Sequence, residues 1–298
     1  MRPRQTSSTP KPPDRRRRQA PAAAVEPERL QKVLARSGVG SRRDMDAWIA
    51  GGRVQVNDRP AELGQRVGPG DRVKVDGRLV NLRFEDRLPR VLLYHKPAGE
   101  IVSADDPEGR TSVFEKLPRL RGARWVSVGR LDYNTEGLLV LTTSGDLAAH
   151  LMHPRHGFER EYAIRVQGEL TPDAMRQLVT GVELEDGPAR FDSLVEAGGE
   201  GRNRWYKAIL REGRYREVRR MLEAVGCTVS RLLRTRYGPI AMPRALKRGM
   251  SREMEPAEVD ALFGTLGIQA PGAAPRRGAG STARVSPAAG RRGVARRR

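Results

Sequence analysis

The chain has 298 residues, of which 38% are hydrophobic, and a formal net charge of +20. This length suggests one or two domains, and the lack of an 18-residue apolar run argues against a membrane span. A single cysteine, Cys227, excludes an internal disulfide framework. We therefore expect a reduced, cytoplasmic, soluble protein with a strongly basic balance.

Much of the positive charge lies at the two ends. Residues 1–20 carry seven basic side chains and one acidic one, and residues 271–298 carry eight basic side chains and no acidic one. Both ends are rich in Pro, Ala and Arg, so residues 1–26 and 268–298 are predicted to be disordered. Basic arms of this kind bind polyanions through phosphate contacts, whereas the alternative is a solvated tail that aids solubility.

Hydrophobic periodicity marks a first block at residues 28–80. Ser41, followed three residues later by Asp44, is typical of a capping box and predicts a helix start. The predicted elements are helices from Leu30 to about Gly38 and from Ser41 to Gly51, and strands at 54–56 and 73–75. The order helix, helix, small sheet indicates a compact N-terminal domain.

A second block, residues 88–267, follows a short linker of mixed polarity. Its predicted strands are 91–94, 126–131, 138–142, 162–166, 205–210 and 229–234. Its predicted helices are 146–152, a segment opened by Thr171 and Pro172, and 218–225. Strands interrupted by occasional helices predict an α+β domain with a mixed, largely antiparallel sheet.

Three segments of this second block carry candidate chemistry. In 129–139 (GRLDYNTEGLL), an apolar strand leads to Asp132, a carboxylate whose burial is costly unless it is paired or functional; the alternative is an Asp that only opens a turn. In 160–166 (REYAIRV), Tyr162 lies on an alternating strand and could equally be a core aromatic residue. The segment 212–222 (EGRYREVRRML) is a glycine turn that opens a basic helix, which could simply face solvent.

Together these segments resemble the pseudouridine synthases, in the branch that modifies ribosomal RNA at single sites. The resemblance covers about residues 28–265 and implies that Asp132 is the nucleophile and that Arg130 displaces and holds the RNA. It implies that Tyr162 stacks on the uracil and that Arg219 pairs with the nucleophile, lowering its pKa. Arg214 is a weaker candidate for that pairing and, with Arg216 and Arg220, a candidate for RNA binding.

The chemistry of such an enzyme requires a carboxylate. Uridine must be detached at N1, turned and rejoined at C5, and an ionised carboxylate can form a transient covalent link to the base or the sugar. No redox change occurs, so no cofactor is expected, and the target base must leave the helical stack to be reached. The segment 133–136 (YNTE) departs from the family pattern, and Glu136 adds negative charge near the site, which bears on substrate choice more than on catalysis.

The first block resembles the S4-type RNA-binding domain. Basic side chains at a helix N-terminus suit phosphate binding, because free amides and cations converge there; the alternative is an exposed basic turn. The resemblance implies RNA contacts by Lys32, Ser41, Arg42, Arg43, Arg53 and Asn57.

Alternatives to this interpretation come from within and outside the branch. The segments RGARW and RNRWY favour an enzyme acting on 23S rRNA of the large subunit over one acting on the 16S rRNA of the small subunit. A non-catalytic RNA-binding assembly factor is a further alternative, which the intact trio Asp132, Tyr162 and Arg219 argues against. His150, His153 and His156 have no obvious cysteine or carboxylate partners nearby in the sequence, so no metal is expected. The sequence shows no clear oligomer signal, so a monomer is the default expectation.

Overall fold

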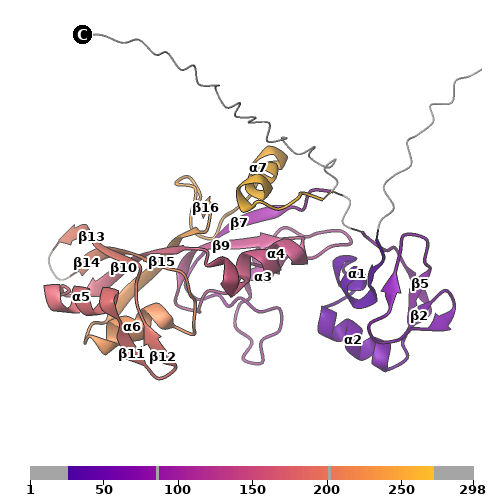
Figure 1. Ribbon diagram of the computed structural model, residues 1–298, viewed down its shortest axis with the longest axis horizontal. Coiled ribbons are helices and arrows are strands. Elements are labelled where there is room, and N and C mark those ends of the chain that lie inside the picture. The colour runs from indigo at the N-terminus through magenta and orange to yellow at the C-terminus, as the bar shows by residue number, and fades with distance from the viewer. Residues whose placement is uncertain (1–25, 85–86, 201–202, 272–298) are drawn as a thin grey trace, which may run out of the picture. The chain divides into compact units, whose positions relative to one another are not determined.

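The structure is a computed structural model that describes residues 26–84, 87–200 and 203–271. Nearly all of the two predicted basic arms lies outside these residues. The described chain divides into two compact units, and Figure 1 labels their elements. The first unit comprises residues 26–84, Ala98–Asn134 and Leu141–His156, and the second comprises residues 87–97, Thr135–Val140 and 157–271.

The start of the first unit has the predicted order of two helices and a small sheet. Its helices are α1 (Leu30–Arg36) and α2 (Arg42–Ala50), and its strands are β1 (Glu28–Arg29), β2 (Val54–Val56), β3 (Arg59–Pro60), β4 (Arg66–Val67), β5 (Val73–Val75) and β6 (Arg78–Val80). The sheet order is β3-β2-β5-β6, with β1 pairing β4 separately. Both predicted helices and both predicted strands are confirmed, while the other strands are two or three residues long and show no usable periodicity.

Local sequence signals explain why these elements form where they do. The Ser41 side chain accepts from the Asp44 amide at 3.1 Å, and the Asp44 carboxylate accepts from the Ser41 amide at 2.7 Å. This reciprocal capping box satisfies two of the otherwise unpaired N–H groups of α2. Asn57 and Asp58 have φ angles of 52° and 64°, the left-handed geometry that a two-residue hairpin between β2 and β3 requires.

An apolar core joins these helices to the sheet. Leu30, Val33 and Leu34 of α1 are fully buried, because helical spacing places them on one side. Met45 and Ile49 of α2 complete that packing from the neighbouring helix.

The rest of the first unit holds short elements. These are α3 (Val113–Lys116), β8 (Val126–Ser127), α4 (Gly145–Met152) and a 3-10 turn at Pro154–His156. β8 pairs with the end of β9 (Glu136–Thr142). The predicted strand 126–131 is therefore too long: it ends at Ser127, because Gly129 takes a left-handed φ of 74° that no strand continues through.

The second unit is built on a large mixed sheet. Its strand order is β13-β14-β10-β15-β9-β7-β17, with β16 added to β15. The strands are β7 (Val91–Lys96), β10 (Arg160–Gln167), β13 (Ser193–Glu200), β14 (Asn203–Leu210), β15 (Val229–Tyr237), β16 (Ile240–Ala241) and β17 (Ser251–Glu253). β10 pairs antiparallel with both neighbours, whereas β9 and β15 run parallel. This confirms the predicted α+β class.

Helices cover one side of that sheet and create the main core. α5 (Pro172–Thr180) and α6 (Glu217–Ala224) lie on the same side of β10, β14 and β15 (Figure 1), with the hairpin of β11 (Val182–Leu184) and β12 (Gly187–Ala189) beside α6. A further helix, α7 (Pro256–Leu266), follows β17. No helix in the described part of the chain combines the length and apolar composition that a membrane crossing needs.

Gly137 is the tightest point of the sheet. An added Cβ there would lie 2.2 Å from the carbonyl oxygen of Arg234 and 2.7 Å from its amide nitrogen, and the φ of Gly137 is 102°. β9 can therefore approach β15 only because this residue has no side chain. The same approach fixes where β9 begins, immediately after the segment that carries Asp132.

We expect Gly137→Ala to lower the free energy of unfolding by about 2–4 kcal/mol, because the backbone of β9 or β15 must move and a positive φ is penalised. Chemical denaturation measures the loss. Gly168→Ala is the matched control, since its φ is 87° but nothing lies within 4 Å of an added Cβ; it should lose only about 1 kcal/mol. Equal losses in the two variants would contradict the close approach.

Candidate active site

Asp132 lies in the loop between β8 and β9, in the first unit. Val128 is buried, Arg130 is exposed, and Asp132 is half-buried immediately before a turn at Tyr133 and Asn134. The Tyr133 carbonyl oxygen accepts a hydrogen bond from the Gly99 amide at 2.9 Å. The candidate nucleophile thus sits on a backbone segment that is tied down one residue further along the chain.

A buried ammonium anchors the second unit at the point where the loop ends and β9 begins. Lys96 is fully buried, and its Nζ donates to the carbonyl oxygens of Pro97 at 2.8 Å and Thr135 at 2.9 Å. A buried charged group is tolerated only when such acceptors receive its protons. Lys96 therefore fixes the backbone just ahead of Glu136.

Glu136 is neutralised by arginines, which answers the concern about its negative charge. Its carboxylate accepts from Arg231 at 2.9 and 3.0 Å and pairs with Arg248 at 2.9 Å. Burial by itself raises the pKa of Glu136, but the hydrogen bond and charge of Arg231 and the charge of Arg248 outweigh it, and the pKa is lowered overall. The residue holds β9 to β15 and the following loop.

Tyr162 lies on β10, in the second unit, between Ala208 of β14 and Arg234 of β15. Its side chain is 8% exposed and belongs to the core cluster with Ile164 and Val166, at a place where the strand register shifts. Its backbone is held on both sides by hydrogen-bonded strands. The geometry is compatible with the core role as well as with the predicted stacking role.

Arg219 is buried in the second unit, on α6. The residue is 9% exposed, and its guanidinium donates to the carbonyl oxygen of Val229, at the start of β15, at 3.2 Å. Arginine is almost never buried without a partner. Arg219 lies on the inner side of α6, and the Val229 carbonyl oxygen is one of its partners. Tyr162 and Arg219 thus belong to the same unit, and Asp132 and Arg130 belong to the other.

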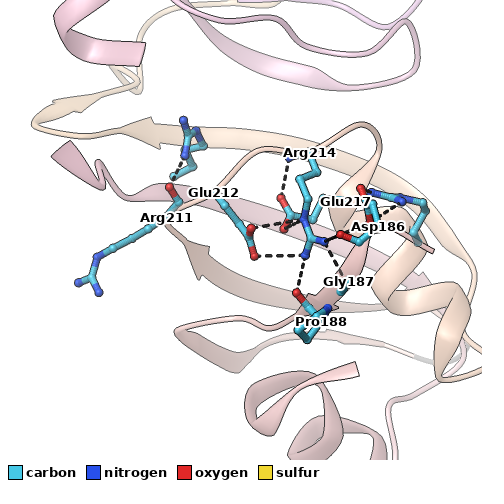
Figure 2. Close-up of polar contacts among 9 residues, drawn as sticks. Asp186, Gly187, Pro188, Arg211, Glu212, Arg214 and Glu217 are labelled. Atoms are coloured by element: carbon cyan, nitrogen blue, oxygen red, sulfur yellow. Dashed lines mark hydrogen bonds and ion pairs between the residues drawn. The ribbon is translucent and has the colours of Figure 1, made fainter. Parts of the chain in front are cut away.

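The three other arginines of this segment differ in how they are used. Figure 2 shows the Arg214 guanidinium surrounded by carboxylates and backbone carbonyls. Arg220 forms two hydrogen bonds of 2.9 Å to Asp186, while Arg216 is half-buried and lies 3.8 Å from Glu223. Arg214 and Arg220 thus have partners within the protein, and the RNA contacts predicted for them stay predictions.

The predicted RNA-binding residues of the first block also have distinct surroundings. Lys32 pairs with Glu28 at 2.8 Å and with Asp146 at 2.6 Å, and Arg42 lies 3.6 Å from Asp146. Arg43, next to Arg42, is exposed.

Three further residues of this set have clear local structural roles. Arg53 pairs with Asp76 and stacks 4.2 Å above the Trp48 ring. Ser41 caps α2, and Asn57 donates to Asp71 at 2.8 Å while its oxygen accepts from the Arg72 amide at 3.0 Å. A local role accounts for these residue types without requiring RNA.

A basic hollow in the first unit adds residues that the sequence did not single out. It is lined by Lys32, Arg36 and Arg42 of the first block and by Arg124 and Gly145 further along the chain. Burial lowers the pKa of Arg124, against the raising effect of Asp44. Arg36 pairs with Glu28 at 2.7 Å. No sequence signal joins these arginines, because they are brought together by the fold across about ninety residues of chain.

Clustered metal ligands are not found in the described part of the chain, where no group of three or more His, Cys, Asp and Glu residues could hold a metal ion. The rings of His150 and His156 stack with centroids 4.0 Å apart. Arg155 lowers the pKa of both histidines, after the larger lowering effect of burial.

Comparisons with known proteins identify the family and the two kinds of domain. The family model of RNA pseudouridylate synthase matches residues 90–224, and the S4 domain model matches residues 28–73. The ribosomal large subunit pseudouridine synthase B of Pseudomonas aeruginosa is 53% identical over 244 residues, which are 81% of this chain and 63% of that protein. The protein of the same name from Salmonella typhimurium is 52% identical over 242 residues, 80% of this chain and 83% of that protein.

A crystal structure of a pseudouridylate synthase has the same fold, with a TM-score of 0.55 at 23% identity over 78% of this chain and 99% of that one. The fold and the sequence relatives together define an RNA-modifying class of protein with an S4 domain in front. The chain belongs to the RNA pseudouridylate synthase family.

We expect Glu136→Gln to lower the free energy of unfolding at pH 7 by about 1–3 kcal/mol, because a charge-assisted pair with Arg231 is lost. The pKa of Glu136 is lowered by folding, so its stabilisation is present above the unfolded pKa of about 4.5 and is lost as the pH falls through the folded value. Denaturation at several pH values should therefore show a gap between wild type and variant that closes in acid. Glu183→Gln, at an exposed position, is the control and should show no gap.

Proposed function

We propose that this chain isomerises uridine to pseudouridine in ribosomal RNA, at a single site in the 23S rRNA of the large subunit, with Asp132 as the nucleophile. The observation that carries the proposal is the 52–53% identity to two ribosomal large subunit pseudouridine synthases B over about four fifths of the chain. Asp132 supports it, since it is a half-buried carboxylate and the next residue, Tyr133, is tied to the Gly99 amide through its carbonyl oxygen.

The proposed reaction balances without any cofactor. The C1′–N1 bond of uridine breaks and a C1′–C5 bond forms, while the C5 proton leaves and N1 takes up a proton. A transient covalent link to the Asp132 carboxylate holds one fragment while the base turns. Tyr162 would stack on the flipped uracil, and Arg219 would pair with Asp132 and keep it ionised at neutral pH. Arg130, which is exposed two residues before Asp132, would displace and hold the RNA.

Binding is proposed to come from the two ends of the chain as well as from the catalytic domain. We propose that residues 28–80 dock the enzyme on rRNA, that residues 88–267 form the catalytic domain, and that the arms at 1–26 and 268–298 add phosphate contacts. The exposed Arg43 and the half-exposed Arg42 are the cations of the first block best placed for RNA. We further propose that the protein works as a cytoplasmic monomer.

Asp132→Asn should abolish pseudouridine formation, a loss of at least about 10³-fold, because an amide cannot act as the nucleophile. Unmodified 23S rRNA is incubated with each protein, and pseudouridine is mapped by carbodiimide-dependent reverse-transcription stops. Asp105→Asn, an exposed aspartate of the same unit, is the control and should keep full activity.

The outcome separates the alternatives. A new stop on 16S rRNA alone would point to the small-subunit type, and tight RNA binding without a stop on any rRNA or precursor subunit would point to a non-catalytic assembly factor.

Arg42→Ala combined with Arg43→Ala should weaken rRNA binding and reduce the slope of log K against log salt concentration by between one and two, because each lost phosphate contact removes about one released counterion. Binding is measured over a series of salt concentrations. Arg59→Ala with Arg78→Ala removes two exposed arginines from the neighbouring sheet and serves as the charge-matched control. An equal change of slope in both double variants would mean that the helix start has no special role.

A further inference from the structure

Helix α6, which carries Arg219, begins in an unusual way. Its N-cap residue, Arg216, has a left-handed φ of 47° and makes no side-chain cap. A side chain other than glycine in this region is uncommon and costs about 1–2 kcal/mol, and Ser, Thr, Asp or Asn would normally occupy the N-cap. Contacts from elsewhere must therefore hold the start of this helix in place.

Glu217, the first residue of α6, provides one such contact. Its side chain is 2% exposed, and its Oε2 accepts a hydrogen bond from the backbone amide of Arg214 at 2.9 Å. Its other oxygen, Oε1, accepts from the Nε of Arg214 at 3.3 Å. The helix start is therefore closed back onto the preceding loop by a carboxylate that points inward instead of by a conventional cap.

The Arg214 side chain extends this contact to a second element. Its guanidinium donates to three successive backbone carbonyls of the β11–β12 hairpin: that of Asp186 in the turn at 3.2 Å, and those of Gly187 at 3.1 Å and Pro188 at 2.8 Å at the start of β12. It also contacts the carboxylates of Asp186 at 3.1 Å and Glu212 at 3.3 Å. Figure 2 shows these acceptors around a single planar fork, and we call Arg214, Asp186, Glu212 and Glu217 the clasp.

Arg220 ties α6 to the same turn from one helical turn further on, through its two hydrogen bonds to Asp186. Arg219 lies between these two attachments, at Glu217 and Arg220. The helix can therefore neither slide along its axis nor rotate without breaking one of them. An error of about 1 Å in the position of a catalytic group can cost about 10²-fold in rate, so such rigidity matters for the residue that the helix carries.

The charges of the clasp are nearly balanced. Three carboxylates, those of Asp186, Glu212 and Glu217, face two guanidinium groups, Arg214 and Arg220. Burial, together with neighbouring Glu212, raises the pKa of Glu217 to about 7, although Arg214 opposes the rise. Burying a charged carboxylate is costly, and the contacts with Arg214 reduce that cost.

We propose that Arg214 is a positioning residue for pseudouridine formation: by clasping the β11–β12 turn and the first turn of α6, it holds Arg219 where the reaction needs it. This inference rests on the proposed function of Arg219. It assigns Arg214 a role away from both the RNA and the nucleophile. Lysine cannot replace it, because one ammonium cannot reach the three carbonyls and three carboxylates that the guanidinium contacts.

Arg214→Lys should lower kcat for rRNA about 10- to 100-fold while KM and the dissociation constant for rRNA change less than threefold. Hydrogen exchange should become faster, about 10-fold or more, at the amides of α6 and of the β11–β12 turn, with the rest of the protein unchanged. Arg211→Lys is the matched control: Arg211 is in the same loop, 56% exposed and paired with Glu159, and the variant should match wild type in both measurements.

Glu217→Ala tests the other half of the clasp. It should reproduce the loss of kcat seen with Arg214→Lys, and the double variant should lose little more than either single one, because both changes open the same contact. If the fold-losses of kcat in the two single variants instead multiply in the double variant, the proposal is wrong.

Other results would overturn it as clearly. If Arg214→Lys has a larger dissociation constant for rRNA and a smaller slope of log K against log salt concentration, with unchanged kcat, then Arg214 contacts RNA. If hydrogen exchange in α6 is faster but kcat is unchanged, the clasp has only a structural role. If wild type forms no pseudouridine, the proposed function fails, and the proposed catalytic positioning fails with it. The exchange data still report separately on whether Arg214 holds α6.

Discussion

The parallel contact between β9 and β15 is the constraint on which the second unit depends. It exists only because Gly137 has no side chain where the Arg234 backbone passes. The buried Arg234 side chain then donates from Nε to the Leu138 carbonyl at 2.9 Å, so that Arg234 contacts two successive residues of β9, one through its backbone and one through its side chain. Along the chain, this contact begins immediately after the segment that carries Asp132.

Buried or half-buried cations that donate to backbone carbonyls recur in this protein. Lys96 holds the start of β9, Arg219 reaches the start of β15, and Arg214 gathers the β11–β12 turn. Carbonyl oxygens are numerous at strand ends and turns, where the sheet leaves them unpaired. A chain rich in arginine can use them to fix loops that have too few apolar residues to pack, and its basic character then serves the fold as well as RNA.

Features encoded by neighbouring residues were predictable from the sequence, and features encoded by distant ones were not. The capping box of Ser41 and Asp44 and the hairpin at Asn57 depend on residues within a few positions, and the structure has both. The clasp could not be predicted, because the carbonyls that Arg214 binds lie 26 to 28 residues away and carry no side-chain signature. Family resemblance selected Asp132, Tyr162 and Arg219, whose roles stay predictions, but it gave no account of Glu136, whose partners lie 95 and more residues further on.

Lys32 is a candidate binding residue whose charge is already paired within the protein. Its ammonium is in contact with two carboxylates, Glu28 and Asp146, and their hydrogen bonds and charges raise its pKa although burial alone would lower it. A phosphate arriving at this point would exchange one anion for another, and no counterion held by Lys32 would be freed into solution. Such an exchange contributes little to affinity for any polyanion. A polyanion would gain from Lys32 only if its backbone replaced the Asp146 carboxylate in position as well as in charge.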